Sequence, residues 1–215
     1  VVACPEADGF RLTAAALVAD GGQVFSPAGG THHGRRDRAS GFCYLNDPVL
    51  AILALLDQGV APVLYLDIDA HHGDGVQEAF AGEARVWTVS LHEAGRWPHR
   101  PDALPGSLRD RGGGQARNLP LPAGFHDDEL AFLLEAAVAP LIEGIQPAAL
   151  VLQAGADGLA DDPMSGLALS NGGYWQALRL VKDLAPRLIV LGGGGYNPWS
   201  VARAWVGCWG ILTGR

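Results

Sequence analysis

The sequence has little cysteine, little positive charge and no long hydrophobic run, and each scarcity excludes a class of protein. Three cysteines in 215 residues, with no CxxC pair, do not make a disulfide framework, so we expect a reducing, cytoplasmic setting. No apolar run of about 18 residues and no hydrophobic leader pattern is visible, which argues against a membrane as a partner. Fifteen Lys and Arg against 23 Asp and Glu give a formal charge of −8, which disfavours nucleic acid and tolerates a cationic substrate.

Apolar segments that predict strands alternate with segments of helical periodicity. With 48% hydrophobic residues, the chain is long enough for a single domain, here residues 1–215, with a substantial core. The predicted strands cover 24–25, 63–68, 86–91, 148–153 and 188–191, and the predicted helices cover 48–56, 127–145, 171–184 and 198–212. Because crossover connections are right-handed, this alternation predicts an α/β fold with an open, mostly parallel sheet between two layers of helices.

Polar clusters follow these strands. They occupy 67–74, 90–92, 153–157 and 192–196. Ligands of parallel sheets bind beyond the carboxyl ends of the strands, so we expect a site built from several loops at one edge. The segment 93–114, rich in Arg, Pro and Gly, is predicted to be a long surface loop beside it.

The densest cluster predicts a metal site. Asp67, Asp69 and His71 alternate at the end of one apolar strand, and Asp157 follows another. Buried carboxylates require a partner, and two carboxylates with one imidazole leave an open coordination position, as in catalytic zinc sites. The alternative is that Asp69 and Asp157 only cap turns.

Adjacent histidines follow the weak first strand in a glycine-rich loop. A histidine pair alone is weak evidence, but Asp67 and Asp74 flank the proposed ligands and suit two His–Asp dyads with His32 and His33. One imidazole would then act as general base and later as general acid. Without these partners, both would be ordinary loop histidines.

Four glycines precede Tyr196 after the last predicted strand. No Lys or Ser/Thr follows them as a phosphate loop requires, so a phosphate cradle is disfavoured. A tyrosine on such a loop could donate its hydroxyl to an oxyanion, or merely pack at a loop end. Gly41, Phe42 and Trp97 could form apolar walls of a channel, or belong to ordinary packing.

Four segments together resemble the histone deacetylase superfamily, in its bacterial acetoin-utilisation and class I-like branch. They read GGTHHGRRDRASGFCYLND at 29–47, LYLDIDAHHGDGV at 64–76, QAGAD at 153–157 and GGGGYN at 192–197. The resemblance implies an arginase/deacetylase fold, one catalytic zinc, and hydrolysis of an acetyl-amide to acetate and a free amine. It also implies an N-terminally shortened member, since the chain opens inside the family's pattern and ends soon after its last motif.

The resemblance also implies a role for each matching residue. The zinc ligands would be Asp69, His71 and Asp157. His33, paired to Asp74, would be the general base and acid, and His32, paired to Asp67, would be its electrostatic partner. Tyr196 would be the oxyanion donor. Gly41, Phe42 and Trp97 match the acyl-lysine tunnel. A structural potassium ion would be held by Asp67, Asp69, His71, Ser90 and Leu91.

The substrate and three alternatives stay open from the sequence. Met164 occupies the position where acetylpolyamine-selective relatives have a glutamate, so acetyl-lysine in a protein or peptide is favoured over a small acetylated amine. The alternatives are an acetylpolyamine amidohydrolase, a non-catalytic acyl-lysine or metal-binding remnant, and a binuclear ureohydrolase of the arginase type. The oligomeric state is not predicted.

Overall fold

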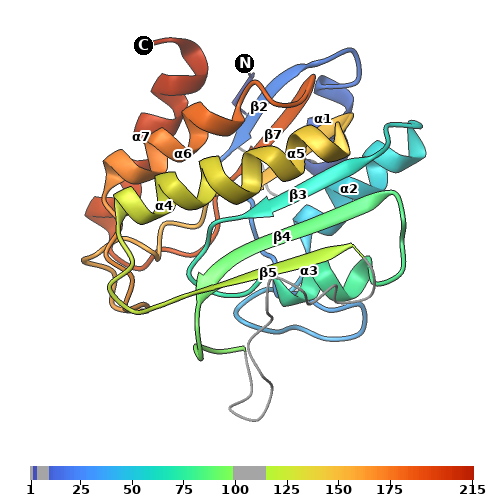
Figure 1. Ribbon diagram of the computed structural model, residues 1–215. Helices are drawn as coiled ribbons and strands as arrows, with labels where there is room; N and C mark the ends of the chain where they lie inside the picture. The colour runs from blue at the N-terminus through green and yellow to red at the C-terminus, as the bar shows by residue number, and fades with distance from the viewer. Residues whose placement is uncertain (1, 4–9, 99–114) are drawn as a thin grey trace.

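A seven-stranded, fully parallel sheet forms the centre of the computed structural model, which describes residues 2–3, 10–98 and 115–215 (Figure 1). The strands are β1 (Val2–Ala3), β2 (Gly22–Ser26), β3 (Val63–Asp67), β4 (Val86–Glu93), β5 (Ala116–Leu121), β6 (Ala149–Gln153) and β7 (Arg187–Leu191), in the order β1-β2-β7-β6-β3-β4-β5. The predicted α/β class and parallel sheet are therefore confirmed.

Helices cover both faces of the sheet. They are α1 (Phe10–Leu17), α2 (Asp47–Asp57), α3 (Asp74–Ala79), α4 (Asp127–Leu133), α5 (Ala139–Ile145), α6 (Asn171–Val181) and α7 (Pro198–Thr213), with a π-helical segment, η1 (Leu134–Val138), between α4 and α5. In Figure 1 the layer from α4 to α7 lies in front of the sheet, and α1, α2 and α3 lie behind it.

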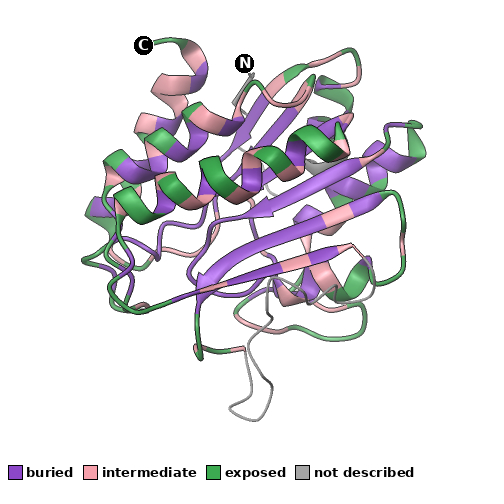
Figure 2. Cartoon of the chain, in the orientation of Figure 1, coloured by how far each residue is buried: buried purple, intermediate pink, exposed green. Residues whose placement is uncertain are grey.

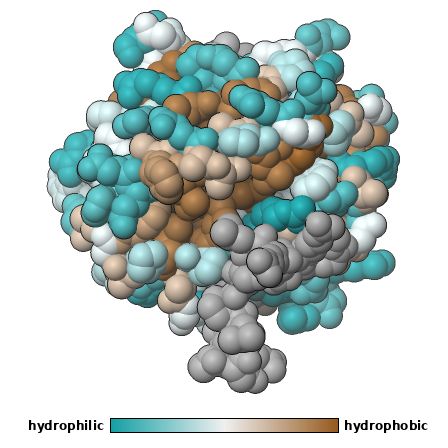
Figure 3. Space-filling model, viewed as in Figure 1, coloured by the Kyte–Doolittle hydropathy of each residue, from teal (hydrophilic) through white to brown (hydrophobic). Residues whose placement is uncertain are grey.

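Two hydrophobic clusters fill the spaces between these layers. Alternate residues of β3 divide between them, because successive side chains of a strand point to opposite faces. Leu64 and Leu66 join the cluster of α4 to α7, whereas Val63 and Tyr65 join the cluster of α1 to α3. The central strands are buried along their length (Figure 2), and apolar side chains also gather on the outer surface beside α4 and α5 (Figure 3).

The register of the strands sets the position of the site. Ser26, Leu191, Gln153, Asp67 and Ser90 are successive register partners across β2, β7, β6, β3 and β4. The loops after β2, β3, β6 and β7 therefore leave the sheet at one level and meet above the same edge.

Several predicted boundaries were wrong. The strand β3 ends at Asp67, so Asp69 and His71 lie in the following turn. The strand β4 extends to Glu93, so residues 90–92 lie inside it rather than after it. The predicted helix over 127–145 contains η1, directly before the first turn of α5. Pro140 in that turn has no backbone N–H to continue regular helical bonding.

Four elements were not predicted, namely β1, α1, α3 and β5. The strand β5 is an edge strand in which Arg117, Asn118 and Pro120 interrupt the apolar pattern. Cys4 and most of the predicted loop, at 99–114, lie outside the described residues. Cys43 and Cys208 are buried free thiols. Within the described part of the chain, none of the helices has the length and hydropathy needed to cross a membrane.

Candidate metal centre

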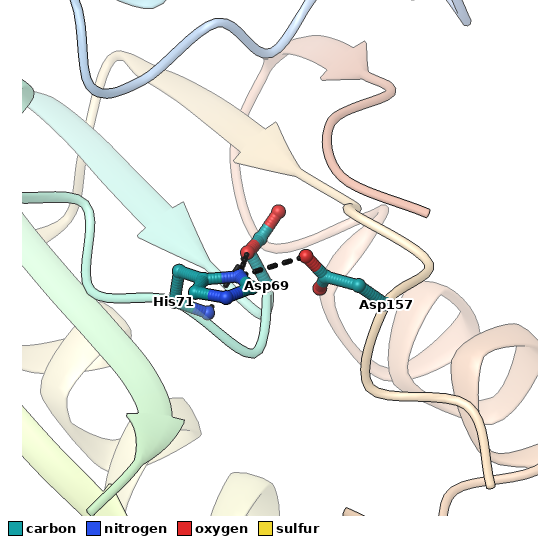
Figure 4. Close-up of side chains that lie close together, drawn as sticks. All are labelled: Asp69, His71 and Asp157. Atoms are coloured by element: carbon teal, nitrogen blue, oxygen red, sulfur yellow. Dashed lines mark hydrogen bonds and ion pairs between the residues drawn. The ribbon is translucent and has the colours of Figure 1, made fainter. Parts of the chain in front are cut away.

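Asp69, His71 and Asp157 converge in the loops beyond β3 and β6 (Figure 4). The Nδ1 atom of His71 lies 2.8 Å from Oδ2 of Asp157 and 3.2 Å from Oδ1 of Asp69. One potential ligand atom from each residue lies within 4.8 Å of the others, and all three residues are buried. Two carboxylates and an imidazole at this spacing could hold a divalent metal ion.

Neighbouring backbone and side-chain donors fix the two carboxylates. Asp157 accepts a hydrogen bond from the amide of Ala70 at 2.8 Å, and Oδ2 of Asp69 accepts from Gln153 Nε2 at 2.9 Å and from the amide of Gly194 at 3.0 Å. These bonds join the loops after β3, β6 and β7 into one unit. Such contacts orient ligating groups and tune metal affinity.

Glycine is required where the backbone passes close to these carboxylates. A Cβ atom on Gly155 would collide with the Asp69 carboxylate, and one on Gly194 would collide with the Asp157 carboxylate. The glycines of the 153–157 and 192–197 segments therefore allow close approach to the centre, as expected from glycine's lack of a side chain.

The charges of the three residues are strongly coupled. Burial alone lowers the pKa of His71, but hydrogen bonds to Asp157 and Asp69 outweigh it and raise that pKa to about 10. Burial and the charge of Asp69 raise the pKa of Asp157 to about 7. Burial would also raise the pKa of Asp69, but the charge of His32 and the hydrogen bond with His71 lower it. A cation at the centre would compensate the same two carboxylates, so the donor set fits a divalent ion.

His32 forms the first of the two predicted dyads. Its Nδ1 lies 2.7 Å from Asp67 Oδ2, which also accepts the hydroxyl of Tyr65 at 2.6 Å, and its Nε2 lies 3.8 Å from Asp69 Oδ1. Burial lowers the pKa of His32, but the charges of Asp67 and Asp69 outweigh burial and raise that pKa to about 9. These two carboxylates therefore favour the protonated form of His32 beside the candidate metal centre.

His33 forms the second dyad and has the opposite character. Its Nδ1 lies 2.8 Å from Asp74 Oδ1, and Arg35 pairs with the other oxygen of Asp74. Burial and the charge of His32 lower the pKa of His33 despite the opposing effect of Asp74. The imidazole of His33 is therefore neutral near pH 7 and can accept a proton at Nε2.

Tyr196 lies on the glycine loop after β7 and lines the same small cavity of about 120 Å³ as the metal group, His32 and His33. Gly193 and Gly195 lie within this loop and have φ angles of +148° and +144°. The buried carboxylate of Asp162 accepts the Tyr196 amide at 2.6 Å. Burial, with the charge of Asp157, raises the pKa of Tyr196 to about 12, so its hydroxyl keeps the proton that it could donate.

A larger pocket of about 610 Å³ opens above this cavity and shares Gly41, Phe42 and His71 with it. Trp97 and Met164 also line it, and the Trp97 ring lies edge-on to His33 with ring centroids 4.7 Å apart. The three predicted channel residues and Met164 are thus brought together around one pocket. Phe42 is 83% exposed and Trp97 is 50% exposed, so the aromatic walls stand at an open rim.

Ser90 and Leu91, predicted beside Asp67 in a potassium site, lie in the neighbouring strand. Ser90 is the register partner of Asp67, and its hydroxyl lies 3.0 Å from Nδ1 of His92 and accepts the Gly73 amide at 3.3 Å.

Some residues of the site were not predicted. Gln153 anchors Asp69, Asp162 supports Tyr196, and a pair formed by Glu93 and Arg96 lies at the rim. A polar residue at the end of the fully buried strand β6 was a usable signal for Gln153. Nothing in the local sequence distinguishes Asp162 from its neighbour Asp161.

Comparisons with known proteins identify relatives of this chain. The family profile described as "Histone deacetylase domain" matches residues 2–212. A "Putative histone deacetylase 2" of Caenorhabditis elegans is 45% identical over 195 residues, which are 89% of this chain and 37% of that protein. "Histone deacetylase 1" of Homo sapiens is 43% identical over 184 residues, which are 83% of this chain and 37% of that protein.

Solved structures show the same fold. The crystal structure of a histone deacetylase homologue from Aquifex aeolicus superposes with a TM-score of 0.88 at 39% identity, covering 96% of this chain and 56% of that one. The crystal structure of the HDA15 HD domain superposes with a TM-score of 0.86 at 26% identity, covering 96% of this chain and 62% of that one. This chain therefore spans only part of the length of these relatives.

Proposed function

Because the chain belongs to the histone deacetylase family, we propose that it is a zinc-dependent hydrolase that removes acetyl groups from acetyl-lysine in proteins or peptides. The observation that carries this proposal is the convergence of Asp69, His71 and Asp157 in a cavity that His33 and Tyr196 also line. Because the chain spans 37% of the length of these curated relatives, the activity of the whole protein is part of the proposal.

Asp69, His71 and Asp157 would hold the zinc ion. Zinc bound there supplies a Lewis acid that polarises the amide carbonyl and activates water for attack. His32, held positive by Asp67 and Asp69, would stabilise negative charge that develops beside the centre. We also propose that Asp67, Asp69, His71, Ser90 and Leu91 hold a potassium ion that stiffens the loop, supported by the pairing of Asp67 with Ser90 across adjacent strands.

His33 would move the proton. With Nδ1 hydrogen-bonded to Asp74, its other nitrogen, Nε2, is left to take a proton from the attacking water and return it to the leaving amine. The lowered pKa of His33 supports the basic role, because the imidazole starts the reaction unprotonated.

Tyr196 would donate its hydroxyl to the developing oxyanion. Its raised pKa keeps the hydroxyl protonated, and the bond from its amide to Asp162 holds the loop at the cavity. Hydrogen bonds aimed at developing charge are among the strongest contributions to catalysis.

The rim supports a long, apolar acyl-lysine side chain as the substrate. Gly41, Phe42 and Trp97 would border its methylenes, since they line the pocket above the metal group. Met164, 37% exposed at the same rim, offers no countercharge for a polyamine, which disfavours an acetylpolyamine as the substrate.

The described residues contain one group of three potential metal ligands, which favours a single ion over a binuclear ureohydrolase site. A full set of proton donors and acceptors around it favours catalysis over a binding remnant.

Turnover of a fluorogenic acetyl-lysine peptide, with one zinc per chain, tests the proposal. We expect turnover that a chelator abolishes and zinc restores. A protein that binds zinc stoichiometrically and leaves the peptide intact would contradict the proposal.

A further inference from the structure

An ion pair between Glu93 and Arg96 stands at the rim of the candidate active site. Both residues line the pocket of about 610 Å³ that also contains His71, Trp97 and Met164. The Glu93 carboxylate is largely buried, whereas the Arg96 side chain is 31% exposed. The mechanism proposed above uses neither residue.

The pair presents hydrogen-bond donors in excess. Glu93 accepts Nε and Nη2 of Arg96, the latter at 3.0 Å, and it also accepts the Gly166 amide at 2.8 Å. A guanidinium has five N–H donors, and Glu93 takes two of them. Among the described residues, Nη1 of Arg96 has no hydrogen-bond partner.

The carboxylate of Glu93 holds Arg96 in place. Two bonds from one guanidinium fix its plane, and the bond to Gly166 ties the pair to the loop that carries Met164. Hydrogen bonding to Glu93 also raises the pKa of Arg96, so its charge persists at every working pH. A guanidinium with its orientation fixed loses less freedom when it binds a planar anion.

We propose that Arg96 forms a carboxylate-binding subsite at the rim, which selects acetyl-lysine substrates that carry a carboxylate close to the acetylated side chain. The proposal rests on the proposed deacetylase function and specifies its substrate class. The carboxylate could belong to a neighbouring Asp or Glu side chain or to the C-terminus of a peptide that ends in acetyl-lysine. Both sources offer two oxygens to the free edge of the guanidinium.

Glu83 and Arg85 provide a matched control within the chain. They form a similar short-range pair, with a distance of 2.7 Å between Arg85 Nη2 and Glu83 Oε2, just before β4, at the opposite end of that strand. Removing Arg85 therefore deletes the same charge from the same kind of pair, far from the rim.

The test compares four acetyl-lysine peptides on the zinc-loaded parent chain, Arg96→Ala and Arg85→Ala. One has neutral flanking residues and an amidated end, one has a flanking Glu, one has the matching Gln, and one ends in acetyl-lysine with a free carboxylate. Turnover gives kcat/KM, and fluorescence anisotropy of the same labelled peptides gives affinity without chemistry. The pair is partly exposed, so we expect a preference of about fivefold for a carboxylate-bearing peptide in the parent chain.

In Arg96→Ala this preference falls to about one while kcat/KM for the neutral peptide stays within about twofold, and in Arg85→Ala the preference is retained. Preference for the Glu peptide or for the free carboxylate identifies the source. Equal values for all peptides in the parent chain, or an equal loss for all peptides in Arg96→Ala, would overturn the subsite. Absence of turnover would refute the deacetylase function. Fluorescence anisotropy would still test the subsite in that case, and equal or undetectable binding of all four peptides would refute the subsite.

Discussion

The Nδ1 atom of His33 lies 2.8 Å from Oδ1 of Asp74, and this bond determines which nitrogen of the imidazole faces the cavity. With Nδ1 occupied, Nε2 is the atom available to the reacting groups. The adjacent His32 is held by Asp67 in the same way but is kept positively charged. The two neighbouring histidines therefore differ, because the charges of Asp67 and Asp69 outweigh burial at His32, whereas burial and the charge of His32 dominate at His33.

Loss of either proton-handling group should remove most of the activity. His33→Ala and Tyr196→Phe should each reduce kcat/KM by the equivalent of about 2–4 kcal/mol of transition-state stabilisation. Tyr44→Phe is the matched control for the tyrosine, because Tyr44 is 84% exposed and lies outside the cavity. Kinetics on an acetyl-lysine peptide measure the effect, and unchanged kcat/KM in Tyr196→Phe would remove the oxyanion role from that residue.

The acid limb of the pH profile should follow His33. Because burial and the charge of His32 lower its pKa, kcat/KM should decrease as the pH falls. The midpoint should lie below about pH 6.5, which corresponds to the ordinary pKa of histidine. Asp74 acts to raise that pKa, so Asp74→Asn should move the midpoint to lower pH and reduce the plateau. Asp37→Asn removes an exposed carboxylate and should leave the midpoint in place. A midpoint that moves upward in Asp74→Asn would show that another group carries the limb.

Zinc should stabilise the fold through the candidate ligands. A ligand that binds only the folded state at 100 times its Kd raises the unfolding free energy by about 2.7 kcal/mol. We expect zinc to raise the Tm of the parent chain and of Asp183→Asn, which alters an exposed carboxylate. The shift should be lost in Asp157→Asn. A full zinc-dependent shift in Asp157→Asn would place the metal elsewhere.

A single methyl group behind Asp69 should weaken the centre. Gly155→Ala places a Cβ against the Asp69 carboxylate, which must move, and we expect zinc affinity to fall at least about tenfold. Gly144→Ala is the control, since nothing lies within 4 Å of its added carbon in α5. That control should stabilise the chain by about 0.5–1 kcal/mol, the usual gain for Ala over Gly in a helix. Competition with a chromophoric chelator measures the affinities, and equal values would mean that the loop absorbs the methyl group.

The sequence predicted the parts of the fold and site that depend on local pattern. The strand β3 is apolar along most of its length, and the polar residues that follow it mark the edge where ligands bind. By contrast, β5 was missed because Pro120 and two polar residues disguise an edge strand.

Contacts between loops were beyond the reach of sequence pattern. The bond from Gln153 to Asp69 spans 84 positions and depends on the adjacent register of β3 and β6. The pair of Glu93 and Arg96 is close in sequence, but its position at the rim depends on β4 extending to Glu93. Phe42, which has a φ of +62°, is exposed at the rim by a backbone conformation that its residue type does not indicate.

The most direct test is a crystal structure of the zinc-loaded protein with anomalous data collected at the zinc edge. We predict one strong peak, bound by Nδ1 of His71 and by a carboxylate oxygen from each of Asp69 and Asp157. A peak away from these three residues, or two peaks of equal strength at the site, would contradict a mononuclear centre facing His33.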